Sequence, residues 1–409
     1  MAGEVFVLGG DQTDFARNYS RDNKDVAALM DDAVAGALDR CGIEPREIET
    51  AHIGNFAGEL FCGQGILGGL FAALRPEFDG VPSGRHEAAC ASGSLAVLGA
   101  AAEIEAGRYG LACVLGVEYM RNVPATTAAQ YLGTAARAGH EFVDAAYIWP
   151  RAFSDLIDVY DARYGIDYRH IARISEINLT NAKRNSKAQT RSWTLAPENF
   201  SEDDDRNPRI EGRVRRYDCA QVTDGAAALF LASRDYAEGW ARRRGVDLAA
   251  VPRILGWGHR SAPILFRDKI ENSKDAPLVF PHVRDTIDDA FGRAGVNDVF
   301  EIDAIETHDC FAMTEYMAID HFGITAPGES WKAIEDGTVD FGGRLPVNPS
   351  GGLIGLGHPV GATGTRMVLD AAKQVMGEAG DYQVEGARRV ATLNIGGSAT
   401  TACCFVIGC

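Results

Sequence analysis

The sequence predicts an α/β fold made of two similar halves, and the order of its apolar segments is the first observation behind this prediction. Residues 4–9 have the apolar character of a buried strand, and residues 48–54 look like the next strand. Between them, residues 25–40 have the period of an amphipathic helix, which ends near Gly42. Strands that alternate with helices in this way are typical of α/β proteins.

The second observation is that a similar order recurs late in the chain. A helix at 282–294 precedes a strand-like segment at 302–308, and in each half a glycine-rich stretch, a helix and a strand follow. The helix of the first half follows Cys90, and the helix of the second half follows His358. Such a duplication places these two residues at related positions. With the halves packed face to face, both could converge on one site.

A third segment separates the halves. It is rich in Arg, Asn, Asp, Gln and Tyr and is punctuated by prolines, with helix-like stretches at 151–164 and 168–184 but no clear strand run. We interpret it as an insertion over one face of the core, not as a flexible linker. The predicted units are therefore 1–118 plus 214–262 for the first half, 119–213 for the inserted loop domain and 263–409 for the second half.

Composition excludes several classes of protein. A formal net charge of −17 over 409 residues argues against nucleic acid or an anionic membrane as the main partner. No basic leader or membrane-length apolar run is visible, so we expect a cytoplasmic protein. The nine Cys form no Cys-x-x-Cys pair, which suits reduced thiols better than disulfides or a zinc site. The sequence predicts no metal site.

Cys90 and His358 are the first candidates for chemistry. Cys90 stands in Glu87-Ala-Ala-Cys-Ala-Ser-Gly, before an Ala-rich helix whose N-terminal dipole favours a thiolate. The alternative is a small cysteine packed among alanines. His358 stands in the glycine-rich run 348–364, where an imidazole can take a proton from a thiol or stabilise an oxyanion. Its alternative role is packing in a glycine-rich turn.

Other candidates follow strands or form a basic cluster. His308 and Cys310 follow the strand at 302–307, where α/β folds place ligand-facing groups, although a capped turn is an equal alternative. The turn Asn394-Ile-Gly-Gly-Ser offers backbone N–H groups for an oxyanion hole, or is an ordinary turn between strands. The candidates for phosphate contact, unless they are ordinary surface residues, are Arg213, Arg215 and Arg216.

Four of these motifs, in this order, resemble the thiolase superfamily. They are Cys90-Ala-Ser-Gly, His308-Asp-Cys-Phe, the run containing Gly357-His-Pro and Asn394-Ile-Gly-Gly. The His-Asp-Cys-Phe form is similar to the sterol-carrier-protein-2-type branch. The resemblance implies a five-layered αβαβα fold, usually a homodimer or sometimes a tetramer, with coenzyme A held largely by the insertion as a co-substrate and no permanent cofactor. It also implies a role in fatty acid or sterol degradation and, in several bacterial relatives, a small partner subunit.

The resemblance further implies acyl transfer between a 3-ketoacyl-CoA and CoA, or the reverse Claisen condensation, through an acyl-Cys90 intermediate activated by His358. The commonest thiolases carry a second catalytic Cys where this chain has Asn394. In the sterol-carrier branch Cys310 would take that acid/base role. His308 and His358 would then stabilise the enolate, and the N–H groups of Cys90 and Gly396 the tetrahedral oxyanion.

Two other functions stay open at this point. One is a retro-aldolase that acts on a steroid side-chain CoA thioester; its relatives lack the nucleophilic Cys, so Cys90 speaks against it. The other is a non-catalytic thiolase-like subunit that binds CoA or lipid. The complete set of Cys90, His308, Cys310 and His358 speaks against this second alternative.

Overall fold

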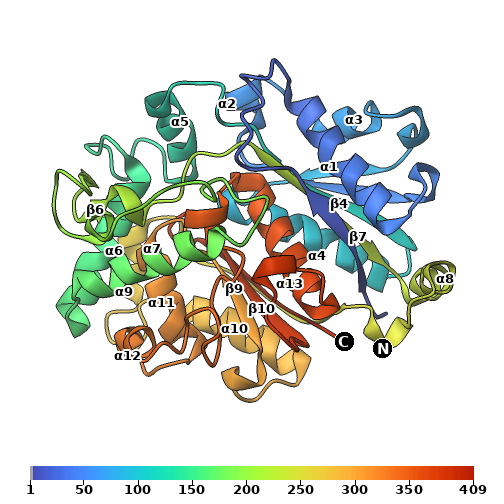
Figure 1. Ribbon diagram of the computed structural model, residues 1–409. Helices are drawn as coiled ribbons and strands as arrows, with labels where there is room; N and C mark the ends of the chain where they lie inside the picture. The colour runs from blue at the N-terminus through green and yellow to red at the C-terminus, as the bar shows by residue number, and fades with distance from the viewer. Residues whose placement is uncertain (1–2) are drawn as a thin grey trace.

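A mixed sheet runs through the molecule, which a computed structural model describes over residues 3–409 (Figure 1). Within this range nine strands form the sheet in the order β3-β2-β4-β7-β1-β8-β11-β10-β9. β1 and β8 pair at a single position, Phe6 with Arg253, so the sheet divides there into two half-sheets. The strands are β1 (Phe6–Gln12), β2 (Thr50–Gly54), β3 (Ser83–His86), β4 (Leu111–Glu118), β7 (Gly225–Ala232), β8 (Arg253–Ser261), β9 (Ala304–Thr307), β10 (Arg389–Gly396) and β11 (Thr401–Gly408).

Two helices lie between the half-sheets. α4 (Ser92–Glu105) packs on β2 and β4, and α13 (Thr363–Met376) packs on strands of both half-sheets, and the two helices contact each other at the centre of Figure 1. α1 (Val26–Cys41) covers the outer face of the first half-sheet, and α10 (Pro281–Ala294) covers the outer face of the second. This arrangement confirms the predicted five-layered αβαβα fold.

The central position of α13 explains its unusual composition. A helix with a neighbour on every side exposes almost nothing to water, so each charge on it needs a buried partner. Arg366 is fully buried and donates to Glu306 at 2.8 Å and to Asp370 at 3.4 Å. Lys373 donates to the same Asp370 at 3.2 Å. The layer between the half-sheets is thus held by an ion-pair network as well as by apolar contacts.

The predicted helix ends are confirmed. The helix expected at 25–40 is α1, and Gly42 after it has a left-handed φ of 59° and donates its N–H to Leu38 and Asp39. The helix expected at 282–294 is α10, and Gly295 caps it in the same way with a φ of 67°. A left-handed cap costs least at glycine, which is why glycine marks both boundaries in the sequence.

Most of the segment between the halves packs on the second half, whereas its first helix packs against Gly58–Cys62 of the first half. Its helices are α5 (Ala125–Leu132), α6 (Ile148–Tyr164) and α7 (Tyr168–Ala182). The apolar faces of α6 and α7 share one core with α10 and with α11 (Ala312–Phe322). It also contains one strand of a minimal hairpin, which the sequence did not predict. The hairpin and the other helices are β5 (Arg209–Glu211), β6 (Val214–Arg215), α2 (Gly58–Cys62), α3 (Leu67–Ala72), α8 (Arg234–Arg244), α9 (Phe266–Asn272) and α12 (Ser330–Glu335).

Strand pairing differs from the predicted boundary between the two halves. The sequence placed 214–262 in the first half, but β8 pairs with β11 over nearly its whole length. β8 therefore lies in the second half-sheet, because strand register and not chain order decides the sheet position. No helix among the described residues is long and apolar enough to cross a membrane.

Candidate active site

Cys90 lies at a sharp turn between β3 and α4. Ala89 before it has a left-handed φ of 50°, which is rare for a residue with a side chain, and the turn continues directly into α4. Ser92 braces the turn, since its hydroxyl donates to the Ala89 carbonyl at 2.6 Å and accepts from the Ala88 N–H at 2.9 Å. The turn presents the Cys90 side chain to a cavity of about 300 Å³. Cys90 is therefore not one more packing residue of the core.

His358 lies on the turn before α13 and faces the same cavity. Its Nδ1 is 2.7 Å from the Thr363 hydroxyl oxygen, and that hydroxyl lies 3.2 Å from the Pro359 carbonyl. Because the Thr363 hydroxyl donates to the carbonyl, it accepts the proton of His358 Nδ1. The other ring nitrogen, Nε2, then carries a lone pair, which is what a base beside a thiol requires.

His308 joins this pair from the end of β9. Its ring lies edge to face with that of His358, with centroids 5.3 Å apart, and its Nδ1 is 3.1 Å from the Asn394 amide nitrogen. The Cys90 sulfur and one nitrogen of each imidazole all lie within 4.8 Å of one another. The structure thus brings together three of the predicted residues, from three separate elements of both halves.

Glycines make this convergence sterically feasible. A Cβ on Gly93 of α4 would lie 2.7 Å from the Thr365 nitrogen and 2.8 Å from the Gly361 carbonyl oxygen, both on the chain around the start of α13. A Cβ on Gly361 would in turn lie 2.7 Å from the Asn55 Cα. Real Cβ atoms do not approach so closely. The two helix N-termini, and the catalytic candidates they carry, can only meet at this distance through glycine.

The site is electrically neutral at rest. Burial raises the pKa of the Cys90 thiol to about 12, although the N–H of Gly397 and that of Cys90 itself favour the thiolate. Burial, with a contribution from Arg366, lowers the pKa of His358 to about 3. Burial and the neighbouring His358 also lower the pKa of His308 well below its usual value. The helix N-terminus suggested a thiolate, but burial outweighs it, so Cys90 needs a base to become a nucleophile.

Cys310 and the turn after β10 complete the inner wall. Cys310 lines the cavity beside Phe311, and its pKa is raised by burial and by the nearby Cys90. Gly397 also lines the cavity, and its N–H favours the thiolate form of Cys90. The predicted Gly396 lies one residue earlier, where its α-carbon packs tightly on the Ala88 carbonyl. The turn therefore presents at least one N–H group to the sulfur. This group belongs to Gly397, the neighbour of the predicted Gly396.

The three predicted arginines have different surroundings. Arg215 is buried and donates to Asp204 at 2.6 Å and to the Asn207 carbonyl at 2.7 Å, which is a structural role. Arg213 is bound to Asp161 at 2.8 Å. Arg216 lines the cavity, with its guanidinium 5.7 Å from the centre of the Tyr217 ring. Proximity in sequence suggested a cluster, but only Arg216 faces the cavity.

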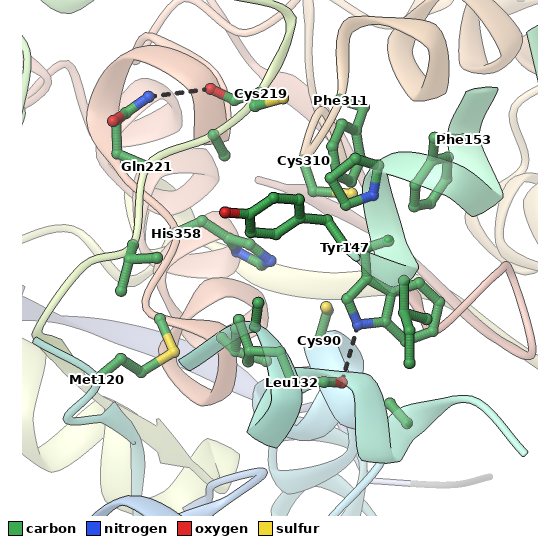
Figure 2. Close-up of a pocket in the computed structure, with 18 of the residues that line it drawn as sticks. Cys90, Met120, Leu132, Tyr147, Phe153, Cys219, Gln221, Cys310, Phe311 and His358 are labelled. Carbon is green, nitrogen blue, oxygen red and sulfur yellow. Dashed lines mark hydrogen bonds between the residues drawn. The ribbon is translucent and has the colours of Figure 1, made fainter. Parts of the chain in front are cut away.

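The outer wall of the cavity comes from the insertion, and its residues were not predicted from the sequence. Tyr147, Trp149 and Phe153 line it, and in the view of Figure 2 the ring of Tyr147 lies between the side chains of Cys310 and His358. Ala125, Ala129 and Leu132 of α5 line another part, at a spacing of four and three residues that puts them on one helix face. That spacing is a signal in the sequence, but it does not reveal which neighbour the face meets.

Glu118, at the end of β4, is another residue of the site that was not predicted from the sequence. Its carboxylate accepts from the Asn55 amide at 2.8 Å and from the N–H groups of Phe56, Ala57 and Gly361 at 2.9, 3.1 and 3.0 Å. Burial raises its pKa to about 7. These bonds tie the first half-sheet to the turn that carries His358. The signal in the sequence that could have indicated Glu118 is its position as a single acidic residue at the end of an apolar strand.

The sulfur and imidazole groups are also ligand types that zinc uses. Their spacing within 4.8 Å fits a nucleophile with its base equally well. We assign them no metal.

Comparison with known proteins identifies the family. Residues 5–188 match the model of the thiolase N-terminal domain, and residues 267–409 match the thiolase C-terminal domain-like model. The chain is 31% identical over 402 residues to an acetyl-CoA acetyltransferase of Methanothermobacter thermautotrophicus, with 98% of each chain covered. It is 26% identical over 403 residues to sterol carrier protein 2 of Homo sapiens, which covers 96% of this chain and 70% of that protein. The protein belongs to the thiolase family.

Solved structures have the same fold. An Ltp2-ChsH2(DUF35) aldolase superimposes with a TM-score of 0.77 at 20% identity, covering 99% of this chain and 98% of that chain. Human mitochondrial 3-ketoacyl-CoA thiolase in complex with CoA superimposes with a TM-score of 0.67 at 14% identity, covering 100% and 98%. These likenesses confirm the fold.

Proposed function

We propose that this protein is an acyltransferase that moves an acyl group between a 3-ketoacyl-CoA and CoA through an acyl-Cys90 intermediate. The observation that carries the proposal is that the Cys90 sulfur and one nitrogen of each of two neutral imidazoles lie within 4.8 Å of one another beside an apolar cavity. A protonated thiol beside an unprotonated ring nitrogen is the resting state that nucleophilic attack requires. Membership in the thiolase family, with an acetyl-CoA acetyltransferase at 31% identity, supports the same reaction.

The first half-reaction starts with a proton transfer from the Cys90 thiol to Nε2 of His358. The sulfur then attacks the keto carbon of the substrate, and the resulting oxyanion lies near the N–H groups at the turn after β10. The bond between C2 and C3 breaks to leave an acyl-Cys90 and the enolate of acetyl-CoA. Cys310, on the same wall, is the candidate that protonates the enolate and becomes a thiolate.

The second half-reaction releases the acyl group. Free CoA gives its thiol proton to Cys310 and attacks the acyl carbon, and Cys90 leaves and recovers its proton from His358. Atoms and charges balance over the cycle, and its reversal is a Claisen condensation. Two acyl transfers replace one difficult carbon–carbon cleavage.

Binding of CoA rests on fewer observations. Arg216 is the member of the predicted cluster that lines the cavity, and a guanidinium is suited to phosphate. We infer that Arg216 contributes to CoA binding and that the apolar wall of the insertion encloses the pantetheine and acyl parts. Arg213 and Arg215 are engaged with carboxylates of the chain itself.

A homodimer is part of the proposal. β3 is an edge strand of the sheet and pairs on one side with β2. Nearby, Leu60 and Ile66 are 40% and 84% exposed. An open sheet edge with exposed apolar side chains is typical of a surface that another chain covers. A small additional partner, as in the name of the aldolase with the same fold, is an extension of this proposal.

A retro-aldolase is the second candidate, because the aldolase superimposes over nearly the whole chain. Cys90 speaks against it, since an aldol cleavage needs no sulfur nucleophile. The test is mass spectrometry of the pure protein incubated with acetoacetyl-CoA, followed by peptide mapping. We expect an acyl adduct on the Cys90 peptide, and neither adduct nor thiolysis in Cys90→Ala. Thiolysis that persists in Cys90→Ala would refute the acyl-enzyme mechanism, and ketone release without an adduct would support the aldolase.

A further inference from the structure

Asn394 occupies a position on β10 that the proposed mechanism leaves without a role. Its side chain is buried, at 1% exposure, and forms two hydrogen bonds. The amide oxygen accepts from the Ser94 hydroxyl at 2.8 Å, and the amide nitrogen lies 3.1 Å from Nδ1 of His308. Ser94 belongs to α4 and His308 follows β9, so Asn394 connects the helix of the nucleophile to the second imidazole.

The direction of the two bonds fixes where protons lie. An amide nitrogen donates and has no acceptor capacity, so Nδ1 of His308 must accept. Burial keeps His308 neutral, since its pKa is lowered well below the usual value, and a neutral imidazole has one ring proton. That proton is then on Nε2, the ring nitrogen that is left free.

Ser94 sets the orientation of the amide. Its hydroxyl has Asn394 as its hydrogen-bond acceptor in the described part of the chain. If the amide were reversed, its NH₂ group would face the hydroxyl, and the hydroxyl proton would have no acceptor in a buried site. The observed orientation satisfies the amide oxygen, the hydroxyl proton and the His308 lone pair together.

The two histidines therefore differ in what they offer to Cys90. Thr363 accepts the proton on Nδ1 of His358, which leaves a lone pair on Nε2. Asn394 donates to Nδ1 of His308, which leaves a proton on Nε2. One ring can take the thiol proton, and the other can already donate to an oxygen of the substrate.

We propose that Asn394 is a positioning residue that holds His308 in the Nε2–H tautomer, so that His308 donates to the substrate oxygen while His358 accepts the proton of Cys90. The tautomer assignment stands on the hydrogen bonds alone, whereas its catalytic consequence rests on the proposed function. Asn394 thus has a task of its own at a position where it cannot exchange protons.

Two variants separate this role from a structural one. Asn394→Asp keeps the shape and the bond from Ser94, but its carboxylate accepts from Nδ1 and stabilises the opposite tautomer. Asn394→Leu keeps the volume and removes both hydrogen bonds, so the tautomers mix. If Asn394 only filled space and bound Ser94, Asp would be the milder replacement. The proposal expects the reverse, with kcat of Asn394→Asp at least tenfold below that of Asn394→Leu and KM changed less.

The direct measurement is the ¹⁵N–¹H correlation spectrum of the full chain with labelled histidine at pH 8, with His308 assigned through His308→Gln. We expect the Nε2–H pattern in the wild type and the Nδ1–H pattern in Asn394→Asp. If Asn394→Asp does not fold, Ser94→Ala replaces it and should show a mixture of tautomers. An Nδ1–H pattern in the wild type, or an unchanged pattern in Ser94→Ala, overturns the proposal. Loss of Cys90 acylation in the wild type would instead count against the proposed function and leave the tautomer assignment intact.

Discussion

Gly93→Ala tests whether the close approach of α4 and α13 creates the site. Gly93 is three residues after Cys90, and the added Cβ would lie 2.7 Å from the Thr365 nitrogen, 2.8 Å from the Gly361 oxygen and 2.9 Å from the Thr365 hydroxyl. Two of these atoms are backbone and cannot rotate away. Ordinary contact begins at 3.4 Å, so the helix N-termini must separate by about 0.7 Å.

The separation has two expected effects of different size. Overpacking a tight core costs about 1–3 kcal/mol of unfolding free energy, and the better helix propensity of Ala offsets at most about 1 kcal/mol of that. Cys90 moves with α4 and His358 with the turn before α13, so the sulfur moves away from the imidazole that we propose as its base. A misplacement of about 1 Å costs about a hundredfold in rate, so we expect Cys90 acylation to slow by roughly ten- to a hundredfold.

The rate of Cys90 acylation is measured by quenching reactions with acetoacetyl-CoA at set times and analysing the intact protein by mass spectrometry. Urea unfolding measures the free energy of unfolding. Gly292→Ala is the matched control, because Gly292 lies in α10 with a surface position and no atom within 4 Å of an added Cβ. In this control Cys90 should be acylated at the wild-type rate, and the free energy of unfolding should rise by up to about 1 kcal/mol. Wild-type acylation and stability in Gly93→Ala would refute the argument that glycine contacts set the geometry.

Two further predictions concern CoA binding and acid stability. Arg216→Ala should raise KM for CoA about tenfold with little change in kcat, because a guanidinium–phosphate contact is lost. Arg213→Ala should change neither parameter. Equal effects of the two variants in steady-state kinetics would contradict the assignment of Arg216 to CoA binding. Burial, together with His52, lowers the pKa of His86 to about 4, so between pH 6.5 and 4 the unfolded chain binds the extra proton and stability falls as the pH falls. Because His86 is partly exposed, its share is about 2 kcal/mol over this range. Urea unfolding of the wild type and His86→Gln at pH 7 and 4.5 should show a smaller loss in the variant, and parallel losses would show that His86 does not contribute.

The helices and strands of the two halves could be predicted because each carries a local signal. The apolar period of α1 and α10 and the glycine after each helix reflect backbone physics that acts within a few residues. Strand neighbours carry no such signal. β8 follows β7 in the chain, yet it pairs with β11, because pairing depends on contacts between distant segments.

The candidate site divides in the same way. Cys90 and His358 stand in unusual local sequences, with small residues around one and glycines around the other, and the duplication related their positions. Tyr147, the face of α5 and the bonds of Glu118 have ordinary local sequences, and their importance comes from the cavity they meet. The arginine cluster shows the opposite error, because adjacent residues on a turn and a short hairpin point to different surroundings.

The fold class, the two similar halves and the candidates for nucleophile and base could be predicted from the sequence, because these depend on periodicity and on residue chemistry that each segment carries. The protonation of the site, by contrast, depends on the tertiary structure. Burial makes Cys90 a thiol and both imidazoles neutral. Partners from other elements, Thr363 for His358 and Asn394 for His308, then assign each ring proton. Charge state and tautomer are properties of the surroundings of a side chain, and those surroundings exist only after the two halves have packed together.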